Sequence, residues 1–198
     1  MATIYGARKD GIREITFTFD DGPSLKNTPK LLDILSKYGI PSVFFVLGER
    51  LKTASARAII KRIKREGHII GNHSFDHANL RALSKEQIVE QLTKTENLIL
   101  ECTGDNRCDL FRPPYGATNS RIADVLKNMG YTQVLWNVDT MDWKYKQEGV
   151  WVDYGLQQIK AREDSIVLMH DIHASTISNV ESFIKKIKKL PNTRFVPY

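Results

Sequence analysis

Long apolar runs and cysteine are both scarce in this sequence of 198 residues. No window reaches the roughly 18 consecutive apolar residues of a membrane-spanning helix, so we expect no membrane span. The first ten residues lack the apolar segment of a secretory signal, which leaves open a cytoplasmic protein and a trimmed secreted or cell-surface domain. Linkers, repeats and low-complexity segments are also lacking, and we therefore expect a single domain over residues 1–198.

The only two cysteines are Cys102 and Cys108, and the segment between them contains a glycine. This spacing permits a short loop closed by a disulfide, and the alternative is a pair of ordinary thiols. Because no second Cys or His pair lies at zinc-finger spacing, the sequence does not indicate a metal site here.

Basic residues exceed acidic ones, 29 against 23, for a formal charge of +6. Such an excess can serve nucleic acid, anionic lipid or an acidic polymer such as a cell wall. Much of it lies on helical patterns, as around Phe183, where the simpler interpretation is a solvated helix face. No nucleic-acid motif accompanies the charge, so we expect no nucleic-acid partner.

Strand-like and helix-like patterns alternate along the chain. Amphipathic stretches typical of helices cover 28–38, 54–66, 85–101, 120–129, 150–162 and 176–190. Short β-rich runs flank them at 14–19, 43–47, 68–72, 110–112, 132–137, 165–170 and 193–196. Seven strands alternating with six helices predict an α/β fold whose parallel strands lie inside a layer of helices. A complete eight-fold barrel uses about 250 residues, and this chain is shorter.

Polar side chains gather where five of the predicted strands end. These clusters are 20–23 (DDGP), 73–77 (HSFDH), 112–116 (RPPYG), 139–143 (DTMDW) and 170–171 (HD). Because the carboxyl ends of parallel strands share one face, we expect the clusters to meet in one active site.

His73 and His77 are candidate metal ligands, since a helical turn would place both imidazoles on one side. A carboxylate from another strand end would complete a shell of two histidines and one acid, which recurs in catalytic zinc sites. Asp20 and Asp21 offer that carboxylate. Adjacent carboxylates point in different directions, so one can bind a metal while the other acts as a base. Taken alone, the segment 20–23 is most typical of a turn.

The other clusters carry groups suited to holding or protonating a substrate. Arg112 precedes two prolines and could clamp a carboxylate bidentately, or it could be an ordinary surface arginine. Asp139 and Asp142 could cap the next segment, whereas an exposed Trp143 beside them suits stacking on a sugar or enclosing an acyl group. His170 ends an apolar strand, where a buried structural histidine is the alternative.

Taken in order, the five clusters resemble the motifs of the NodB-type polysaccharide deacetylases, carbohydrate esterase family four. The resemblance runs from about residue 14 to residue 196 and includes 67–74 (GHIIGNHS). It implies a deformed (β/α)7 barrel, in agreement with the seven strands counted above. It also implies an enzyme that hydrolytically removes acetyl groups from a polysaccharide, and we expect a monomer.

The resemblance assigns a metal and a base. By it, Asp21, His73 and His77 hold a divalent metal, most commonly zinc and in some members cobalt or nickel. Asp20 is then the base that deprotonates the water on the metal, and Arg112 holds Asp20.

The resemblance also assigns an acid and a pocket. Asp142 orients His170, which donates a proton to the leaving group. The backbone N–H of Tyr115 helps to bind the oxyanion, and Trp143 and Leu168 enclose the acetyl methyl. An amide needs this help because it is a poor electrophile with a poor leaving group.

An acetylated polysaccharide is the expected substrate. The segment 164–176 most resembles peptidoglycan N-acetylglucosamine deacetylases of Gram-positive bacteria, and chito-oligosaccharides and acetylxylan stay open. Two other functions are weaker alternatives. A non-catalytic carbohydrate-binding domain would lack a base or a ligand, and neither is missing. A hydrolase of small cyclic amides or imides is disfavoured by the intact Arg112 and Asp142–Trp143 clusters.

Overall fold

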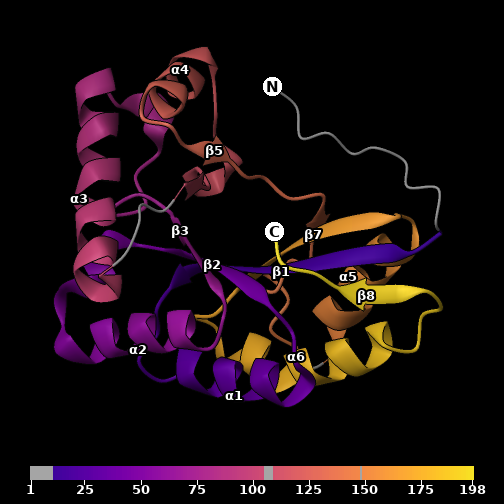
Figure 1. Ribbon diagram of the computed structural model, residues 1–198. Coiled ribbons are helices and arrows are strands. Elements are labelled where there is room, and N and C mark those ends of the chain that lie inside the picture. The colour runs from indigo at the N-terminus through magenta and orange to yellow at the C-terminus, as the bar shows by residue number, and fades with distance from the viewer. Residues whose placement is uncertain (1–10, 105–108, 148) are drawn as a thin grey trace.

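A parallel sheet curls through the centre of the molecule in the computed structural model, which describes residues 11–104, 109–147 and 149–198 (Figure 1). Its strands are β1 (Arg13–Gly22), β2 (Ser42–Val46), β3 (Ile69–Asn72), β4 (Leu110–Phe111), β5 (Thr132–Gln133), β6 (Val138–Asp139), β7 (Asp164–His170) and β8 (Thr193–Phe195). The order is β5-β4-β3-β2-β1-β7-β6, with β8 paired to β1 off this path. One edge of β1 pairs with β7 along most of its length. The other edge of β1 pairs with β8 at its start and with β2 further along.

Helices cover the outer face of the sheet. They are α1 (Thr28–Tyr38), α2 (Ala54–Arg65), α3 (Lys85–Thr103), α4 (Ser120–Asn128), α5 (Val150–Lys160) and α6 (Ala174–Ile187), with short 3-10 turns η1 (Gly48–Lys52), η2 (Leu80–Ala82) and η3 (Pro114–Gly116). Figure 1 shows α1, α2 and α6 beneath the sheet and α3 at one side. Local signals fix the helix ends: α3 starts at a Ser84–Gln87 capping box, and Gly39 ends α1 in a left-handed conformation.

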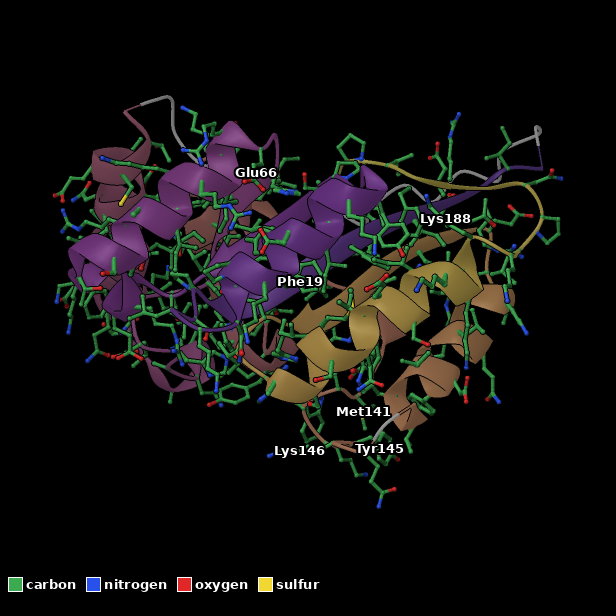
Figure 2. The ribbon with its side chains drawn as sticks, turned by 90° about the horizontal axis from the view of Figure 1, so that it is seen from below. Phe19, Glu66, Met141, Tyr145, Lys146 and Lys188 are labelled. Carbon is green, nitrogen blue, oxygen red and sulfur yellow. The ribbon has the colours of Figure 1, made fainter. Side chains whose placement is uncertain are left out.

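Alternation along the central strands separates the core from the site. On β1, Phe17 and Phe19 lie in the core cluster with residues of α1 and α6, and Figure 2 labels Phe19 between these helices. Thr18 and Asp20 point to the opposite face, which carries the polar groups. Apolar residues of the neighbouring strands, such as Phe45 of β2, fill part of this inner face. Both faces are therefore covered, as parallel sheets require.

The strand predicted over 132–137 is wrong as a single element. Two two-residue strands, β5 and β6, replace it at opposite edges of the sheet. Between them the carbonyls of Val134 and Leu135 accept hydrogen bonds from Arg112, and the side chain of Asn137 bonds to the backbone of Asp164 and Ile166. Side chains thus take over the backbone groups that a continuous strand would pair, and the segment crosses from one edge to the other.

The predicted fold class is confirmed, but the seven strands of the main path are not the seven predicted: β5 and β6 replace one predicted strand, and β8, predicted at 193–196, lies off the path. Seven strands follow one parallel path with helices outside, which is the predicted deformed (β/α)7 barrel in a single domain. None of the helices described is long and apolar enough to cross a membrane. Cys102 is buried near the end of α3, whereas Cys108 lies outside the described residues, so the disulfide stays a prediction.

Candidate active site

The predicted clusters meet in one cavity at the carboxyl ends of the strands. The cavity holds about 470 Å³. Eight of the ten predicted site residues line it: Asp20, Asp21, His73, His77, Tyr115, Trp143, Leu168 and His170. Arg112 and Asp142 are fully buried and contact Asp20 and His170 from behind. Because Asp20 and His170 are register partners on β1 and β7, the sheet itself holds them side by side.

A β-bulge at the end of β1 brings two adjacent carboxylates together. β1 pairs Asp20 and Gly22 with consecutive residues of β2, so Asp21 is the extra residue, and its φ is 72°. A bulge re-aims a side chain that a regular strand would point to the opposite face. Oδ2 of Asp20 and Oδ1 of Asp21 lie 3.6 and 3.4 Å from Nε2 of His73. The expectation that these carboxylates point in different directions is therefore wrong, because both reach one imidazole.

Asp21, His73 and His77 present one ligand atom each to a common point. Oδ1 of Asp21 lies 3.3 Å from Nε2 of His77, and the three ligand atoms lie within 4.8 Å of one another. Among the residues described, this buried Oδ1 has no hydrogen-bond partner. An orphaned carboxylate oxygen beside two imidazole nitrogens fits a divalent metal, and this donor set is typical of catalytic zinc.

The orientation of His73 and the charge of Asp21 suit metal ligands. Nδ1 of His73 lies 2.7 Å from the carbonyl oxygen of Arg112, so Nδ1–H donates to it and Nε2 faces the two carboxylates. Burial, the largest single effect, raises the pKa of Asp21, but the imidazoles of His73, His170 and His77 together outweigh it and lower that pKa to about 2. The Asp21 carboxylate is therefore ionised at neutral pH.

An irregular loop, not the expected helical turn, brings His77 to His73. Residues 73–77 contain no helix, and Ser74 and His77 have φ of 72° and 63°. The Ser74 hydroxyl accepts the backbone N–H of His77 at 3.2 Å, and the two imidazole centroids lie 5.1 Å apart. The expected spacing argument is wrong in its geometry, while the convergence of the two imidazoles is confirmed. Burial lowers the pKa of His77, which keeps its ring neutral and able to bind a metal.

A buried arginine holds Asp20 from behind. Nη1 of Arg112 donates to Oδ1 of Asp20 at 2.8 Å and to the hydroxyl of Thr18 at 2.7 Å. Nε and Nη2 donate at 3.2 Å to the carbonyls of Val134 and Leu135. Among the residues described, the guanidinium thus reaches Asp20 through Nη1 and directs Nε and Nη2 to backbone carbonyls, where a bidentate clamp on a carboxylate was expected. Oδ2 of Asp20 is left to face His73.

A second buried carboxylate holds His170. Oδ1 of Asp142 lies 2.8 Å from Nδ1 of His170, and its Oδ2 accepts the backbone N–H of His170 at 2.7 Å and the Thr176 hydroxyl at 2.6 Å. Burial, the largest single effect, lowers the pKa of His170, but Asp142 and the more distant Asp20 and Asp21 outweigh it and raise that pKa to about 9. His170 is therefore an imidazolium at neutral pH, with Nε2 as its remaining donor.

Exposed aromatic side chains frame the cavity. Tyr115 is 68% exposed and its ring stacks edge-on against His77, with centroids 4.5 Å apart. Its backbone N–H has no hydrogen-bond acceptor among the residues described. Trp143 is 46% exposed, and the buried Leu168 on β7 lines the same cavity. The cavity therefore offers apolar contacts for a small acyl group and exposed aromatic rings on which a sugar can stack.

Backbone strain concentrates around the cavity. Five of the six non-glycine residues with positive φ in the described part of the chain lie on these loops: Asp21, Ser74, His77, Tyr115 and Met141. Left-handed conformations cost of order 1–3 kcal/mol each and cluster at functional sites. Met141 lies with Tyr145 and Lys146 on the loop before α5 (Figure 2).

Comparison with known proteins identifies the family to which the chain belongs. Residues 7–134 match the sequence model of a family described as polysaccharide deacetylase. The chain belongs to the polysaccharide deacetylase family. It is 38% identical over 176 residues to the peptidoglycan-N-acetylglucosamine deacetylase PgdA of Listeria monocytogenes, a match that covers 89% of this chain. The same match covers 36% of PgdA, so the chain spans about a third of that relative's length.

Two solved structures show the range of this polysaccharide deacetylase fold. A T48 deacetylase solved with substrate superposes with a TM-score of 0.85 and 36% identity, over 94% of this chain and 88% of the other. BA3943 of Bacillus anthracis, a CE4 family pseudoenzyme, superposes with a TM-score of 0.80 and 28% identity, over 93% of this chain and 64% of the other. Since the second relative is a pseudoenzyme, the fold alone does not establish catalysis.

Four further residues line the cavity of this polysaccharide deacetylase: Trp136, Asp139, Ile172 and His173. The sequence offered a signal for two of them. Asp139 belongs to the polar cluster 139–143. His173 is a further titratable residue, two positions after the polar pair 170–171 that follows an apolar strand. Trp136 lies in the segment predicted as a strand, and its place depends on the crossing between β5 and β6. For Ile172 the sequence offered no signal, because it follows the polar pair as an ordinary apolar residue.

Proposed function

We propose that the chain is a metal-dependent hydrolase that removes acetyl groups from an N-acetylglucosamine-containing polysaccharide, peptidoglycan foremost. The meeting of the Asp21, His73 and His77 ligand atoms with Asp20 and His170 in one cavity carries this proposal. The name of the Listeria relative supports the substrate, and a peptidoglycan substrate would set the chain at the cell surface.

Asp21, His73 and His77 would hold the metal, zinc foremost and cobalt or nickel as alternatives. When bound, a divalent metal supplies Lewis acidity toward the amide carbonyl and the attacking water. Nε2 of His73 faces the site because its Nδ1–H is held by a backbone carbonyl, the lowered pKa of His77 favours a neutral ring, and Asp21 provides a negative charge.

Asp20 would be the general base. Its free oxygen faces the metal ligands, while Arg112 fixes its other oxygen at 2.8 Å. Asp20 takes a proton from the attacking water as the water oxygen bonds to the carbonyl carbon. Arg112 acts as a positioning residue, because it holds the carboxylate and does not reach the cavity.

His170 would be the general acid. With Nδ1 held by Asp142, Nε2–H donates its proton to the amide nitrogen as the carbon–nitrogen bond breaks, and the products are acetate and a free amine. The N–H of Tyr115, which has no acceptor among the described residues, would stabilise the developing oxyanion, and losing such a donor costs roughly 10²–10³ in rate. Trp143 and Leu168 would enclose the acetyl methyl.

The raised pKa of His170 predicts the alkaline limit of activity. The rate should fall as the pH rises through about 9, because the acid then loses its proton. In an Asp142→Asn variant the pKa of His170 should fall, since the buried carboxylate that raises it is gone. When that pKa lies one unit below the assay pH, about ninety per cent of the molecules lack the proton. A pH profile of kcat/KM for acetate release measures this shift.

The exposed Asp153→Asn variant on α5 is the matched control and should keep the wild-type profile. An unchanged alkaline limb in Asp142→Asn would remove His170 from the acid role. On the stability side, protonated His170 favours the folded state below its ordinary pKa of 6.5, and this contribution is lost as the pH rises toward 9.

A substrate panel tests the proposed function. Zinc-loaded protein should release acetate from peptidoglycan and from chitin oligomers, whose acetyl groups are amides. Acetylxylan, whose acetyl groups are esters, is included for comparison. Release from acetylxylan alone would change the substrate class to an ester. Hydrolysis only of small cyclic amides or imides would overturn the proposal.

A further inference from the structure

A buried carboxylate that no step of the proposed reaction uses lies beneath the turn between β1 and α1. Asp171 follows His170 at the end of β7 and is 0% exposed. The hydroxyl of Thr28, the first residue of α1, donates to Oδ2 of Asp171. The same hydroxyl accepts the backbone N–H of Ser24 at 2.7 Å. Thr28 thus ties the turn to the strand that carries His170.

The backbone of the turn rests directly on this carboxylate. A Cβ placed on Gly22 would overlap both carboxylate oxygens of Asp171, far inside van der Waals contact. Glycine is required here for close approach, because the Asp171 carboxylate occupies the space that a side chain would fill. Asn27 adds a second tie, since its Nδ2 donates to the carbonyl of Ile172 at 2.8 Å.

These contacts bear on Asp21 because Asp21 precedes Gly22 and has a left-handed backbone. Such a conformation persists only where the surroundings over-determine it. On one side of Asp21 the sheet pairs Asp20 with His170. On the other side Gly22 lies against Asp171, which is itself held by Thr28.

We propose that Asp171 and Thr28 form a positioning pair that holds the bulge at Asp21 so that its carboxylate meets His73 and His77. The pair acts through the shape of the Asp171 side chain and the hydrogen bond that it accepts. The proposal rests on the proposed function, because it assumes that these three residues bind a metal. It adds two residues to the site that touch neither substrate nor metal.

Zinc affinity of the purified full chain, measured by competition with a chromophoric chelator, tests this role without any substrate. Thr28→Val and Asp171→Ala should weaken zinc binding about 10–100-fold, the usual cost of losing an outer partner of a metal ligand. The conservative variants Thr28→Ser and Asp171→Asn should restore most of the affinity, since each keeps the hydrogen bond and the shape. The visible spectrum of bound Co²⁺ should change in the first two variants and return in the second two.

Thr95→Val is the matched control. Thr95 is also fully buried, but its hydroxyl bonds within α3, to the carbonyl of Gln91 at 3.1 Å. This variant should lose stability without losing zinc affinity. If Asp171→Ala does not fold, the comparison of Thr28→Val with Thr28→Ser decides the question alone.

Wild-type zinc affinity in a folded Thr28→Val variant would overturn the proposal and leave the proposed function standing. Weakened binding in Thr28→Ser equal to that in Thr28→Val would overturn it as well, because the hydroxyl would then not be what matters. A wild-type chain that binds no zinc would contradict the proposed metal site and this inference together.

Discussion

An Asp20→Asn variant is expected to lose about 10²–10⁴-fold in turnover while still binding zinc, because a positioned general base contributes about that much. The carboxamide keeps the size of the side chain and can still accept the hydrogen bond of Arg112, which is 2.8 Å long in the wild type. It cannot accept a proton at neutral pH. Acetate release at saturating substrate and zinc binding by competition measure the two effects separately.

The exposed Asp124→Asn variant on α4 makes the same change of charge away from the cavity and should be fully active. Circular dichroism checks that Asp20→Asn is folded, since weakening a buried ion pair is destabilising. Unchanged turnover in folded Asp20→Asn would remove Asp20 from the base role. Loss of zinc binding together with turnover would instead make Asp20 a ligand.

Removal of a metal ligand is the second change for which we expect a large loss of activity. Asp21→Ala and His77→Ala are each expected to weaken zinc binding by more than about 100-fold, since losing even an outer partner of a ligand costs about 10–100-fold. Acetate release should fall with the bound metal. Asp21 and His77 suit this test better than His73, because their side chains are 18% and 25% exposed and that of His73 is 2% exposed.

The Asp76→Ala variant is the control for this loop. Asp76 is exposed between the two histidines, and its carboxylate accepts the N–H of Ala78 at 3.1 Å. It should keep zinc affinity and activity. Full zinc binding in either ligand variant would contradict the assignment of these three residues as the metal site.

The sequence could predict at which face of the sheet the site residues lie, because that placement follows from the alternation of strand-like and helix-like patterns. Strands that alternate with helices are parallel, and their carboxyl ends share one face. Asp20 and His170 were therefore expected at the same face of the sheet, and the structure adds that their strands are direct neighbours. Behind them, Arg112 and Asp142 are placed by the same rule, since each belongs to a segment that reaches this face.

Local backbone conformation could not be predicted, because long-range contacts decide it. The bulge at Asp21 depends on Gly22 lying against Asp171, which is 149 residues away along the chain. The loop that carries His77 is held by Gln91 of α3, whose Oε1 accepts the backbone N–H groups of Phe75 and Asp76, where spacing alone suggested a helical turn. The crossing after β5 depends on carbonyls that turn toward Arg112. In each case a side chain from elsewhere supplies what the local pattern lacks.

One measurement tests most directly whether the cavity is a metal-dependent deacetylase site: acetate release from an N-acetylglucosamine polymer before chelation, after chelation, and after zinc is returned. We predict that release stops when the metal is removed and recovers when zinc or cobalt is added. The folded chain should remain intact throughout, as judged by circular dichroism. Release that continues at the full rate in the metal-free protein would contradict the central claim.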